Sequence, residues 1–218
     1  MIRLTRGLKP RVLAENEERW AREYAELRAG GDAPKAAAFR YRDPEIKEAV
    51  IRDSHRKCIY CESRPLHVTP GDVEHQRPKS KFPEEIVNWE NLGFVCPDCN
   101  REKGDFHDDV EPVIDPFSED PAAFIRFAGP AVFEQPGSRR GIVSIRKLSL
   151  DRAELLERRG EHLRKVQSLL NSWAALPDGP ARDEIASEVR TLAKDPGEYA
   201  AATRAFLALE GPDVPQIG

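Results

Sequence analysis

The chain has 218 residues, of which 33% are charged and 39% apolar, and its formal net charge is -4. This length is enough for one large domain, or for a small core with additions, that buries a hydrophobic interior without disulfides. No apolar run approaches the roughly 20 residues of a membrane-spanning helix, and the start lacks the apolar stretch of about 7 to 15 residues found in secretory signals. We therefore expect a soluble cytoplasmic protein with no membrane association.

The acidic net charge argues against a nucleic-acid protein, because affinity for phosphate comes from clustered lysine and arginine. The local distribution of charge differs from the average, since two short basic runs stand out: Arg3, Arg6, Lys9 and Arg11 near the start, and Arg77, Lys79 and Lys81 after His75. Each run is either a solvated surface or a contact to phosphate.

Two helices are predicted ahead of residue 57. Residues 15–31 have an amphipathic pattern that ends at the pair Gly30-Gly31. Residues 43–57 follow Asp43 as the N-cap, with Pro44 in the first turn.

The four cysteines form two C-x-x-C pairs, Cys58 with Cys61 and Cys96 with Cys99. A two-residue spacer lets a tight turn direct both thiolates at one metal, and two such turns complete a tetrahedral zinc site. Four sulfur ligands leave no open position, so this zinc is expected to be structural. The alternatives are a redox pair, which would need a thioredoxin-like pattern that is absent, and four buried free thiols.

Between the cysteine pairs, residues 72–78 are predicted to be a strand that runs into a loop, and residues 91–95 a second strand. Residues 96–105 begin as a turn and continue as a helix. The order strand, strand, helix, together with an acid, a histidine and two asparagines, predicts a site for metal-assisted hydrolysis.

The remaining chain is predicted to be mixed. Asp-Pro steps at 115–116 and 120–121 open turns or short helices, and residues 131–148 alternate around a Pro-Gly-Ser turn like a hairpin. A helix from about residue 151 carries an apolar stripe and is broken at 176–180, and two short helices follow, the last opened by Asp195 and Pro196. The stripe consists of Leu163, Val166, Leu170 and Trp173.

The predicted chemistry has three parts. Glu74 and Asn100 provide oxygen ligands for Mg²⁺ or another hard divalent cation. His75, as a neutral imidazole, is the candidate general base, and Asn91 braces the loop. Alone, His75 would more often satisfy hydrogen bonds at a strand end, and each asparagine would serve a turn or a helix cap. The presence of candidate metal ligands, a candidate base and a bracing residue in one segment favours a catalytic role for His75.

None of the four other histidines is assigned a catalytic role, and for two of them alternatives stay open. His55 precedes Cys58 by three residues and either supports the zinc site or is solvated, and His107 either approaches the metal and phosphate or does not. Trp89 and Phe94 are expected to be core residues rather than platforms for bases.

The segments VEHQRPKS, NWENLGFVCPDCN and CNREKGD resemble the HNH endonuclease family, whose ββα-metal fold has the same order of elements and often the same cysteine pairs. The resemblance covers residues 58–105 and implies that Glu74 and Asn100 are metal ligands, that His75 is the general base, that Asn91 holds the loop and that Lys103 lies near phosphate. Glu74 replaces the aspartate or histidine usual in the family, and compared with aspartate it is longer by about one carbon-carbon bond.

A weaker resemblance extends over nearly the whole length. The segments CIYCE, EHQRPKSKFPE, WENLGFVCPDCNREKGD, IDPFSEDPAAFIRF and IRKLSLDRAELLERR are similar to HNH proteins of Septu-type antiphage defence and of some retron systems. This resemblance implies an ATPase partner encoded nearby and flanking helices that act as an adaptor surface. It leaves open whether the protein forms an oligomer or a hetero-complex.

Taken together, the sequence predicts an α+β protein with a small zinc-stapled ββα-metal core and helical N- and C-terminal additions. The expected division is an N-terminal helical adaptor (1–57), a nuclease core (58–110) and a hairpin and helical region (111–218). The predicted function is metal-dependent hydrolysis of DNA, with phosphate contacts from Arg77, Lys79, Lys81 and Lys103. The alternative is a non-catalytic zinc-stapled module that binds nucleic acid or protein, which would have no need of the acid, histidine and asparagine.

Overall fold

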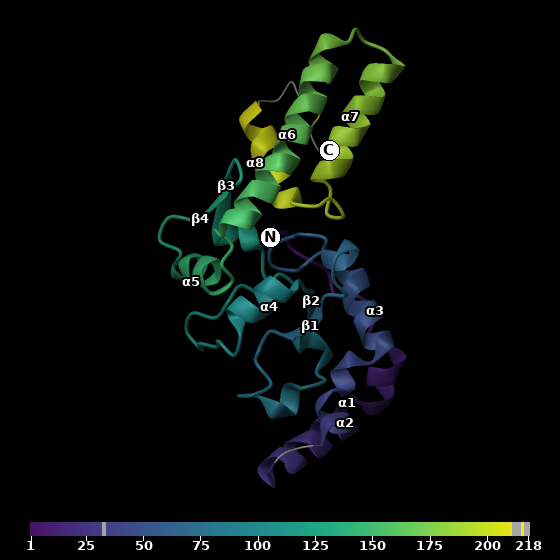
Figure 1. The fold of residues 1–218 in the computed structure, drawn as a ribbon, viewed down its shortest axis with the longest axis vertical. Coiled ribbons are helices and arrows are strands. Elements are labelled where there is room, and N and C mark those ends of the chain that lie inside the picture. The colour runs from purple at the N-terminus through teal and green to yellow at the C-terminus, as the bar shows by residue number, and fades with distance from the viewer. Residues whose placement is uncertain (32–33, 211–214, 216–218) are drawn as a thin grey trace.

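The computed structural model describes residues 1–31, 34–210 and 215. Figure 1 shows an elongated molecule with its small sheet near the middle, N-terminal helices at one end and a pair of long C-terminal helices at the other. The N-terminal helices are α1 (Arg11–Ala29), α2 (Lys35–Ala38) and α3 (Pro44–Asp53), with a 3₁₀ turn η1 (Arg40–Arg42) between the last two. The central unit comprises β1 (Asp72–His75), β2 (Leu92–Val95) and α4 (Pro97–Lys103). The C-terminal part comprises β3 (Ile125–Ala128), β4 (Ala131–Glu134), α5 (Arg139–Lys147), α6 (Ala153–Ala175), α7 (Pro180–Ala193) and α8 (Ala200–Glu210).

The N-terminal helices follow the capping signals of the sequence. The side chain of Asp43 accepts a hydrogen bond of 2.9 Å from the Glu45 backbone, and Pro44 stands in the first turn of α3. Gly30 caps the C-terminus of α1. Both predictions are confirmed, although α1 begins earlier than predicted, directly after Pro10, and α3 ends at Asp53.

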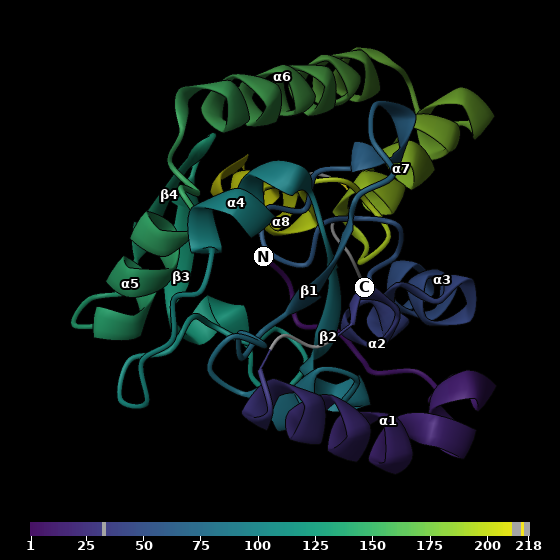
Figure 2. The ribbon, with the colours of Figure 1, turned by 60° about the horizontal axis from the view of Figure 1, so that its bottom comes forward.

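The predicted strand, strand, helix order is also confirmed. β1 and β2 pair antiparallel, with Asp72 opposite Val95 and His75 opposite Leu92. Since neighbouring side chains of a strand point to opposite faces, Val73 packs with apolar residues of α1 and α3 on one face, whereas the face of Asp72 lies against α4. Figure 2 shows α4 on one side of the two strands and α1 on the other.

The predicted hairpin across residues 131–148 is wrong. β4 pairs instead with the preceding strand β3, around Gly129, and residues 139–147 form the helix α5. The Pro-Gly-Ser turn leads into this helix, because the hydroxyl of Ser138 accepts a 3.0 Å hydrogen bond from the Gly141 backbone as an N-cap. The buried residues Ser144, Ile145 and Leu148 follow helical spacing rather than alternation.

The C-terminal helices agree with the prediction except at one boundary. In α6 the side chains of Leu163, Val166 and Leu170 are buried and Trp173 is half-buried, and the helix ends before the predicted break. α8 starts at Ala200, after the predicted opening at Asp195 and Pro196. Lys57, which follows α3, binds backbone carbonyls of the intervening loop.

Buried side chains of the described residues form three hydrophobic clusters. One joins the first residues of the chain, the cysteines, and parts of β3, α5, α6 and α8. A second joins α1 and α3 to the β1-β2 sheet, and a third lies between α6, α7 and α8. The fold is therefore a mixed α+β arrangement in which helical flanks pack on a small cysteine-bearing core, as predicted.

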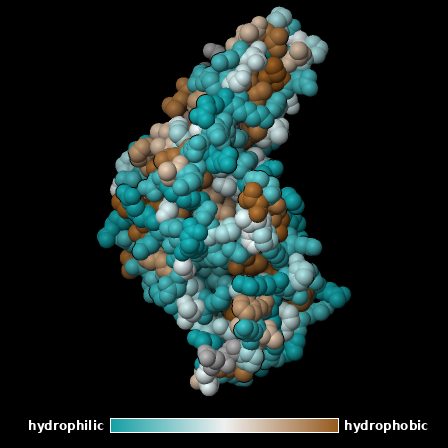
Figure 3. Space-filling view, in the orientation of Figure 1, coloured by the Kyte–Doolittle hydropathy of each residue, from teal (hydrophilic) through white to brown (hydrophobic). Residues whose placement is uncertain are grey.

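Most of the visible surface is polar, as expected when the apolar side chains are gathered in these clusters. Figure 3 shows a face that is mainly hydrophilic, with small separate apolar patches, including one along the protruding α6-α7 pair. Within the described part of the chain, no helix is both long enough and apolar enough to cross a membrane.

Candidate active site

The four cysteines meet at one point, although they come from two distant segments. The sulfur atoms of Cys58, Cys61, Cys96 and Cys99 all lie within 4.8 Å of one another, and all four side chains are buried. Cys96 is also the N-cap of α4, since its sulfur accepts a hydrogen bond from the Cys99 backbone. Four converging thiols fit tetrahedral zinc, which takes closed four-sulfur sites in structural roles.

Groups around the cysteines also fit a negatively charged metal-thiolate centre. The guanidinium of Arg152 lies 3.8 Å from the Cys99 sulfur. The hydroxyl of Ser63 lies 3.3 Å from the Cys61 sulfur and 3.0 Å from the hydroxyl of Tyr199. Arg152 and Tyr199 belong to the C-terminal part, so the cysteine cluster is a junction between that part and the central unit.

Lys57, a residue with no predicted role, forms a second junction. Its buried ammonium donates to the carbonyls of Asp195 and Gly197 at 2.6 and 2.7 Å and lies 3.3 Å from a carboxylate oxygen of Glu62. Burial lowers the pKa of Lys57, and Glu62 opposes that shift. The contact fixes the loop before α8 onto the segment that carries Cys58.

His75 ends β1 with its side chain buried. Its Nε2 lies 2.8 Å from the carbonyl oxygen of Ile86. A carbonyl only accepts hydrogen bonds, so Nε2 carries the proton of the neutral ring and Nδ1 holds the lone pair. Burial lowers the pKa of His75 to about 3, with Lys79 and Lys103 adding to the effect. The ring is therefore neutral near pH 7, as a general base must be.

Glu74 faces the other side of β1 and pairs with Lys103 of α4. The ammonium of Lys103 lies 2.5 Å from Oε1 of Glu74 and donates to the backbone carbonyl of His75 at 2.9 Å. Burial raises the pKa of the Glu74 carboxyl, whereas Lys103 opposes this shift. Lys103 is thus buried and bonded to Glu74 and to the backbone of His75, whereas the other predicted phosphate contacts are exposed or half-buried.

Asn100 is oriented by Asp72, a residue with no predicted role. Nδ2 of Asn100 donates to a carboxylate oxygen of Asp72 at 3.0 Å. Because an ionised carboxylate only accepts, the amide oxygen of Asn100 lies outside this bond. Asp72 and Glu74 alternate along β1 and so lie on one face of it. That alternation was the available signal for Asp72.

Asn91 holds the loop that follows β1. Its Oδ1 accepts from the Arg77 backbone at 2.7 Å, and its Nδ2 donates to the carbonyls of Arg77 and Glu85 at 3.0 and 3.3 Å. The side chain is buried. These contacts are the ones that a residue bracing the loop would make.

Replacing Asn91 by alanine should therefore destabilise the protein. Each buried polar group left without a partner costs about 1–3 kcal/mol, and about 1 kcal/mol moves the Tm of a chain of this size by roughly 2–4 °C. Calorimetry should show a Tm lower by roughly 5 °C or more. Asn171→Ala, at an exposed position of α6, should change stability by no more than about 0.5 kcal/mol. Equal Tm values for the two variants would contradict the bracing role.

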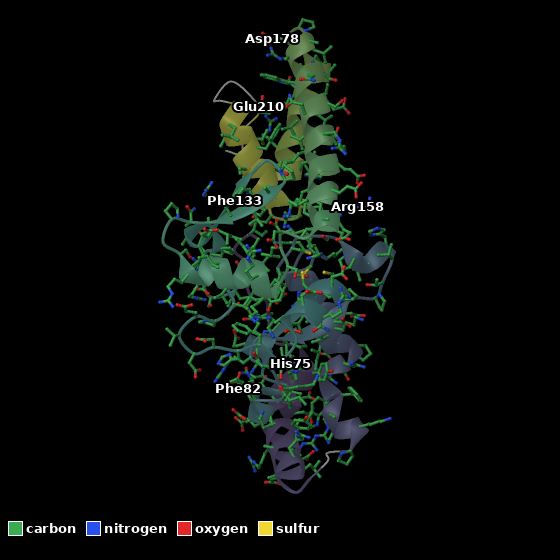
Figure 4. All side chains as sticks on the ribbon, turned by 60° about the vertical axis from the view of Figure 1, so that its left-hand side comes forward. His75, Phe82, Phe133, Arg158, Asp178 and Glu210 are labelled. Carbon is green, nitrogen blue, oxygen red and sulfur yellow. The ribbon has the colours of Figure 1, made fainter. Side chains whose placement is uncertain are left out.

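The three remaining predicted phosphate contacts lie on or near the loop after β1. Arg77 pairs with Glu85 and lies 3.9 Å above the Phe82 ring. Lys79 is half-buried, and Lys81 is exposed. Figure 4 labels Phe82 and His75 in the lower half of the molecule, and the segment that follows the loop reaches the candidate base through the Ile86 carbonyl.

A cavity of about 510 Å³ adjoins this loop and is lined by residues that include Gln76, Arg77, Asn91 and His107. His107 pairs with Asp109 at 3.0 Å and packs edge-on against Phe82. His107 therefore lies near the loop that carries the cations, although no contact joins it to Glu74 or Asn100 among the described residues.

His55 and Arg6, whose roles the sequence left open, both contact protein groups in the structure. His55 lies in the turn after α3 with a φ of 54°, and burial lowers its pKa. Arg6 of the first basic run inserts between Trp89 and Phe117 and donates to the Leu92 carbonyl at 2.6 Å. Arg6 of this run therefore contributes to packing.

Comparison with known proteins agrees with the motifs. Residues 58–106 match the family described as HNH endonuclease. A Septu protein PtuB of Bacillus thuringiensis is 34% identical over 127 residues, which cover 58% of this chain and 46% of that protein. A Septu protein PtuB of Bacillus mycoides (strain KBAB4) is 27% identical over 165 residues, with 59% and 56% covered. The chain spans about half the length of these curated relatives. The resemblance inferred from the motifs is confirmed, since the chain carries an HNH endonuclease domain and is homologous to Septu protein PtuB.

Proposed function

We propose that this chain, which carries an HNH endonuclease domain, is a metal-dependent endonuclease that hydrolyses DNA phosphodiester bonds. One observation carries the proposal. A buried, neutral His75 is held at Nε2 by the Ile86 carbonyl, next to Glu74 and on the same small sheet that positions Asn100 through Asp72. A module that only binds would gain nothing from this arrangement.

Two kinds of metal fit the donor groups. The four thiols suit structural zinc. Glu74 and the amide oxygen of Asn100 offer the oxygen ligands that Mg²⁺ or another hard divalent cation prefers. When bound there, such a cation neutralises the charge that develops on the phosphate and on the leaving oxygen. Lys103 then has a positioning role, because it holds the Glu74 carboxylate and the His75 carbonyl, and we assign it this role in place of the predicted phosphate contact.

The residues of the chain carry the proton transfer and hold the substrate. Nδ1 of His75 takes a proton from water as the water oxygen bonds to phosphorus and the bond to the 3′-oxygen breaks. The leaving 3′-oxygen takes a proton from solvent, and the products are a 5′-phosphate and a 3′-hydroxyl. Arg77, Lys79 and Lys81 hold the sugar-phosphate backbone without reading sequence.

We further propose that this nuclease is the effector of an antiphage defence system and acts in the cytoplasm with an ATPase encoded nearby. The relatives named as Septu proteins support this context. In this proposal residues 58–110 are the nuclease core, and the flanks 1–57 and 111–218 provide the surface for the partner.

Incubation of a supercoiled plasmid with the purified chain tests the activity. We expect nicked or linear DNA with Mg²⁺ or Mn²⁺ and intact DNA with EDTA, because the proposed site needs a divalent cation. Parallel reactions include the product of the neighbouring gene with ATP. DNA that stays intact in every reaction, but shifts in a native gel, would reject the nuclease and favour the binding module.

A further inference from the structure

Tyr41, which lies outside the HNH motif, contacts the candidate base. It belongs to the turn η1, between α2 and α3, and only 3% of its surface is exposed. The centroid of its ring lies 4.6 Å from that of the His75 imidazole, and the two planes meet at 78°. This is an edge-to-face contact of the kind that aromatic rings favour. A residue of the N-terminal segment therefore touches the end of β1.

The same tyrosine also holds a cation of the loop after β1. The ammonium of Lys79 lies 3.0 Å from the Tyr41 hydroxyl and 4.5 Å from the centroid of its ring. Both contacts are favourable, because the hydroxyl accepts a hydrogen bond and the face of the ring attracts a cation. Tyr41 thus contacts the candidate base with its ring and a predicted phosphate contact with its hydroxyl.

These contacts restrain the imidazole at two places. The carbonyl of Ile86 holds Nε2, and the ring of Tyr41 packs against the imidazole from another element. A rotation of the imidazole by half a turn would put a carbon atom in the position of Nδ1. Water at that position would then meet no lone pair that can take its proton. Such a turn has to break the hydrogen bond to Ile86 and displace the Tyr41 ring.

We propose that Tyr41 is a positioning residue of the nuclease site, whose ring keeps Nδ1 of His75 in place and whose hydroxyl holds Lys79 for the DNA phosphate. This inference rests on the proposed function. It implies that residues 58–106, which match the HNH family, do not contain the whole site. The N-terminal segment then completes the site in addition to any role in binding a partner.

The competing explanation is packing alone, since Tyr41 also belongs to the hydrophobic cluster of α1, α3 and the sheet. Packing predicts a change in stability without a change in the state of the imidazole. Tyr24 provides the matched control, because it is a buried tyrosine of the same cluster, and among the described residues no ring or cation contact joins it to His75 or Lys79.

The experiment compares Tyr41→Phe, Tyr41→Leu, Lys79→Met, the double variant Tyr41→Phe/Lys79→Met and the control Tyr24→Phe in the full chain. Each is tested for DNA cleavage with Mn²⁺, for DNA affinity with Ca²⁺, and by ¹⁵N NMR of the histidine side chains. The NMR spectrum reports which nitrogen of His75 carries the proton, and it does so whether or not the protein cuts DNA.

For Tyr41→Leu we expect a fall in kcat of about tenfold or more, since small misplacements of a reacting group have effects of this size, and a mixed His75 tautomer. Tyr41→Phe keeps the ring and should keep kcat and the tautomer of the unmodified chain, while KM rises several-fold. Lys79→Met should raise KM at least as much as Tyr41→Phe, because it removes the cation together with its contact to the hydroxyl. The double variant should show no rise beyond that of Lys79→Met, because the hydroxyl acts through Lys79. Tyr24→Phe should match the unmodified chain in every measurement.

A folded Tyr41→Leu variant with the tautomer and kcat of the unmodified chain would reduce Tyr41 to packing. If that variant does not fold, the comparison of Tyr41→Phe, Lys79→Met and their double variant decides, and additive effects on DNA affinity reject the shared contact. If the unmodified chain shows no nuclease activity, the proposed function is rejected. The roles of the Tyr41 ring and hydroxyl are still tested in that case, by the His75 tautomer and by DNA affinity measured with Ca²⁺.

Discussion

Replacing Cys58 by serine should leave the protein poor in zinc and largely unfolded. A structural zinc contributes apparent free energies of about 10–16 kcal/mol in zinc-finger peptides, which is comparable to the roughly 5–15 kcal/mol of net stability of a typical domain. Removing one of the four sulfur ligands should forfeit much of this term. Metal analysis of the purified variant should give far less than one zinc per chain, and circular dichroism should show lost helix.

The loss should extend beyond the cysteine cluster. The hydrophobic cluster that contains the cysteines also contains residues from the start of the chain and from β3, α6 and α8. Arg152 and Lys57 add polar contacts between the central unit and the C-terminal part. Chelation of zinc from the unmodified protein should therefore abolish the thermal transitions of the core and the C-terminal helices together, as one cooperative event.

His55→Ala is the control for this prediction, because it changes a polar residue close to Cys58 in sequence without removing a sulfur ligand. It should retain full zinc content and the Tm of the unmodified protein within a few degrees. A Cys58→Ser variant that is monomeric, zinc-free and as stable as the unmodified protein would show that the four cysteines are merely buried thiols.

The features that the sequence predicted correctly are those with local signals. Asp43 and Gly30 cap helices in the structure as their positions indicated, and two C-x-x-C turns meet as their spacing required. The wrong hairpin shows the limit of such signals. Residues 139–148 contain apolar residues at intervals that suit both a strand and a helix, and only the burial of Ser144 and Leu148 on one face resolves the choice.

The contacts that complete the candidate site have no local signal. The pair of Glu74 and Lys103 joins β1 to α4, and the pair of Tyr41 and His75 joins an N-terminal turn to β1. Each forms only after the helices pack on the sheet, so no spacing rule predicts it. Lys103 illustrates the consequence, since its motif position suggests a phosphate contact while tertiary packing buries its ammonium against protein oxygens.

His75→Ala should reduce the rate of DNA cleavage by about 10²–10⁴-fold, the range that a positioned general base contributes. The variant should keep its zinc, because His75 is not one of the cluster's sulfur ligands. Single-turnover cleavage with Mn²⁺ measures the rate, and metal analysis checks the zinc. His67→Ala removes an exposed histidine that bonds to the Arg64 carbonyl and should cut at the rate of the unmodified chain. A folded, zinc-loaded His75→Ala variant that also cuts at that rate would remove His75 from the mechanism.

The pH dependence gives a second test of His75. Its pKa is about 3 in the folded protein and about 6.5 when unfolded, so the unfolded chain gains a proton first as the pH falls. The buried neutral imidazole therefore makes its full contribution to the free energy of unfolding above pH 6.5, and this contribution is lost progressively as the pH falls toward 3. Between pH 7.5 and pH 5 the free energy of unfolding should fall by about 2 kcal/mol more in the unmodified protein than in His75→Ala. Urea unfolding of both proteins at the two pH values measures this difference. Over the same range the cleavage rate of the unmodified protein should show no step near pH 6.5 from His75, because the base stays unprotonated. A His75 signal that titrates near pH 6.5 in the folded protein would contradict both expectations.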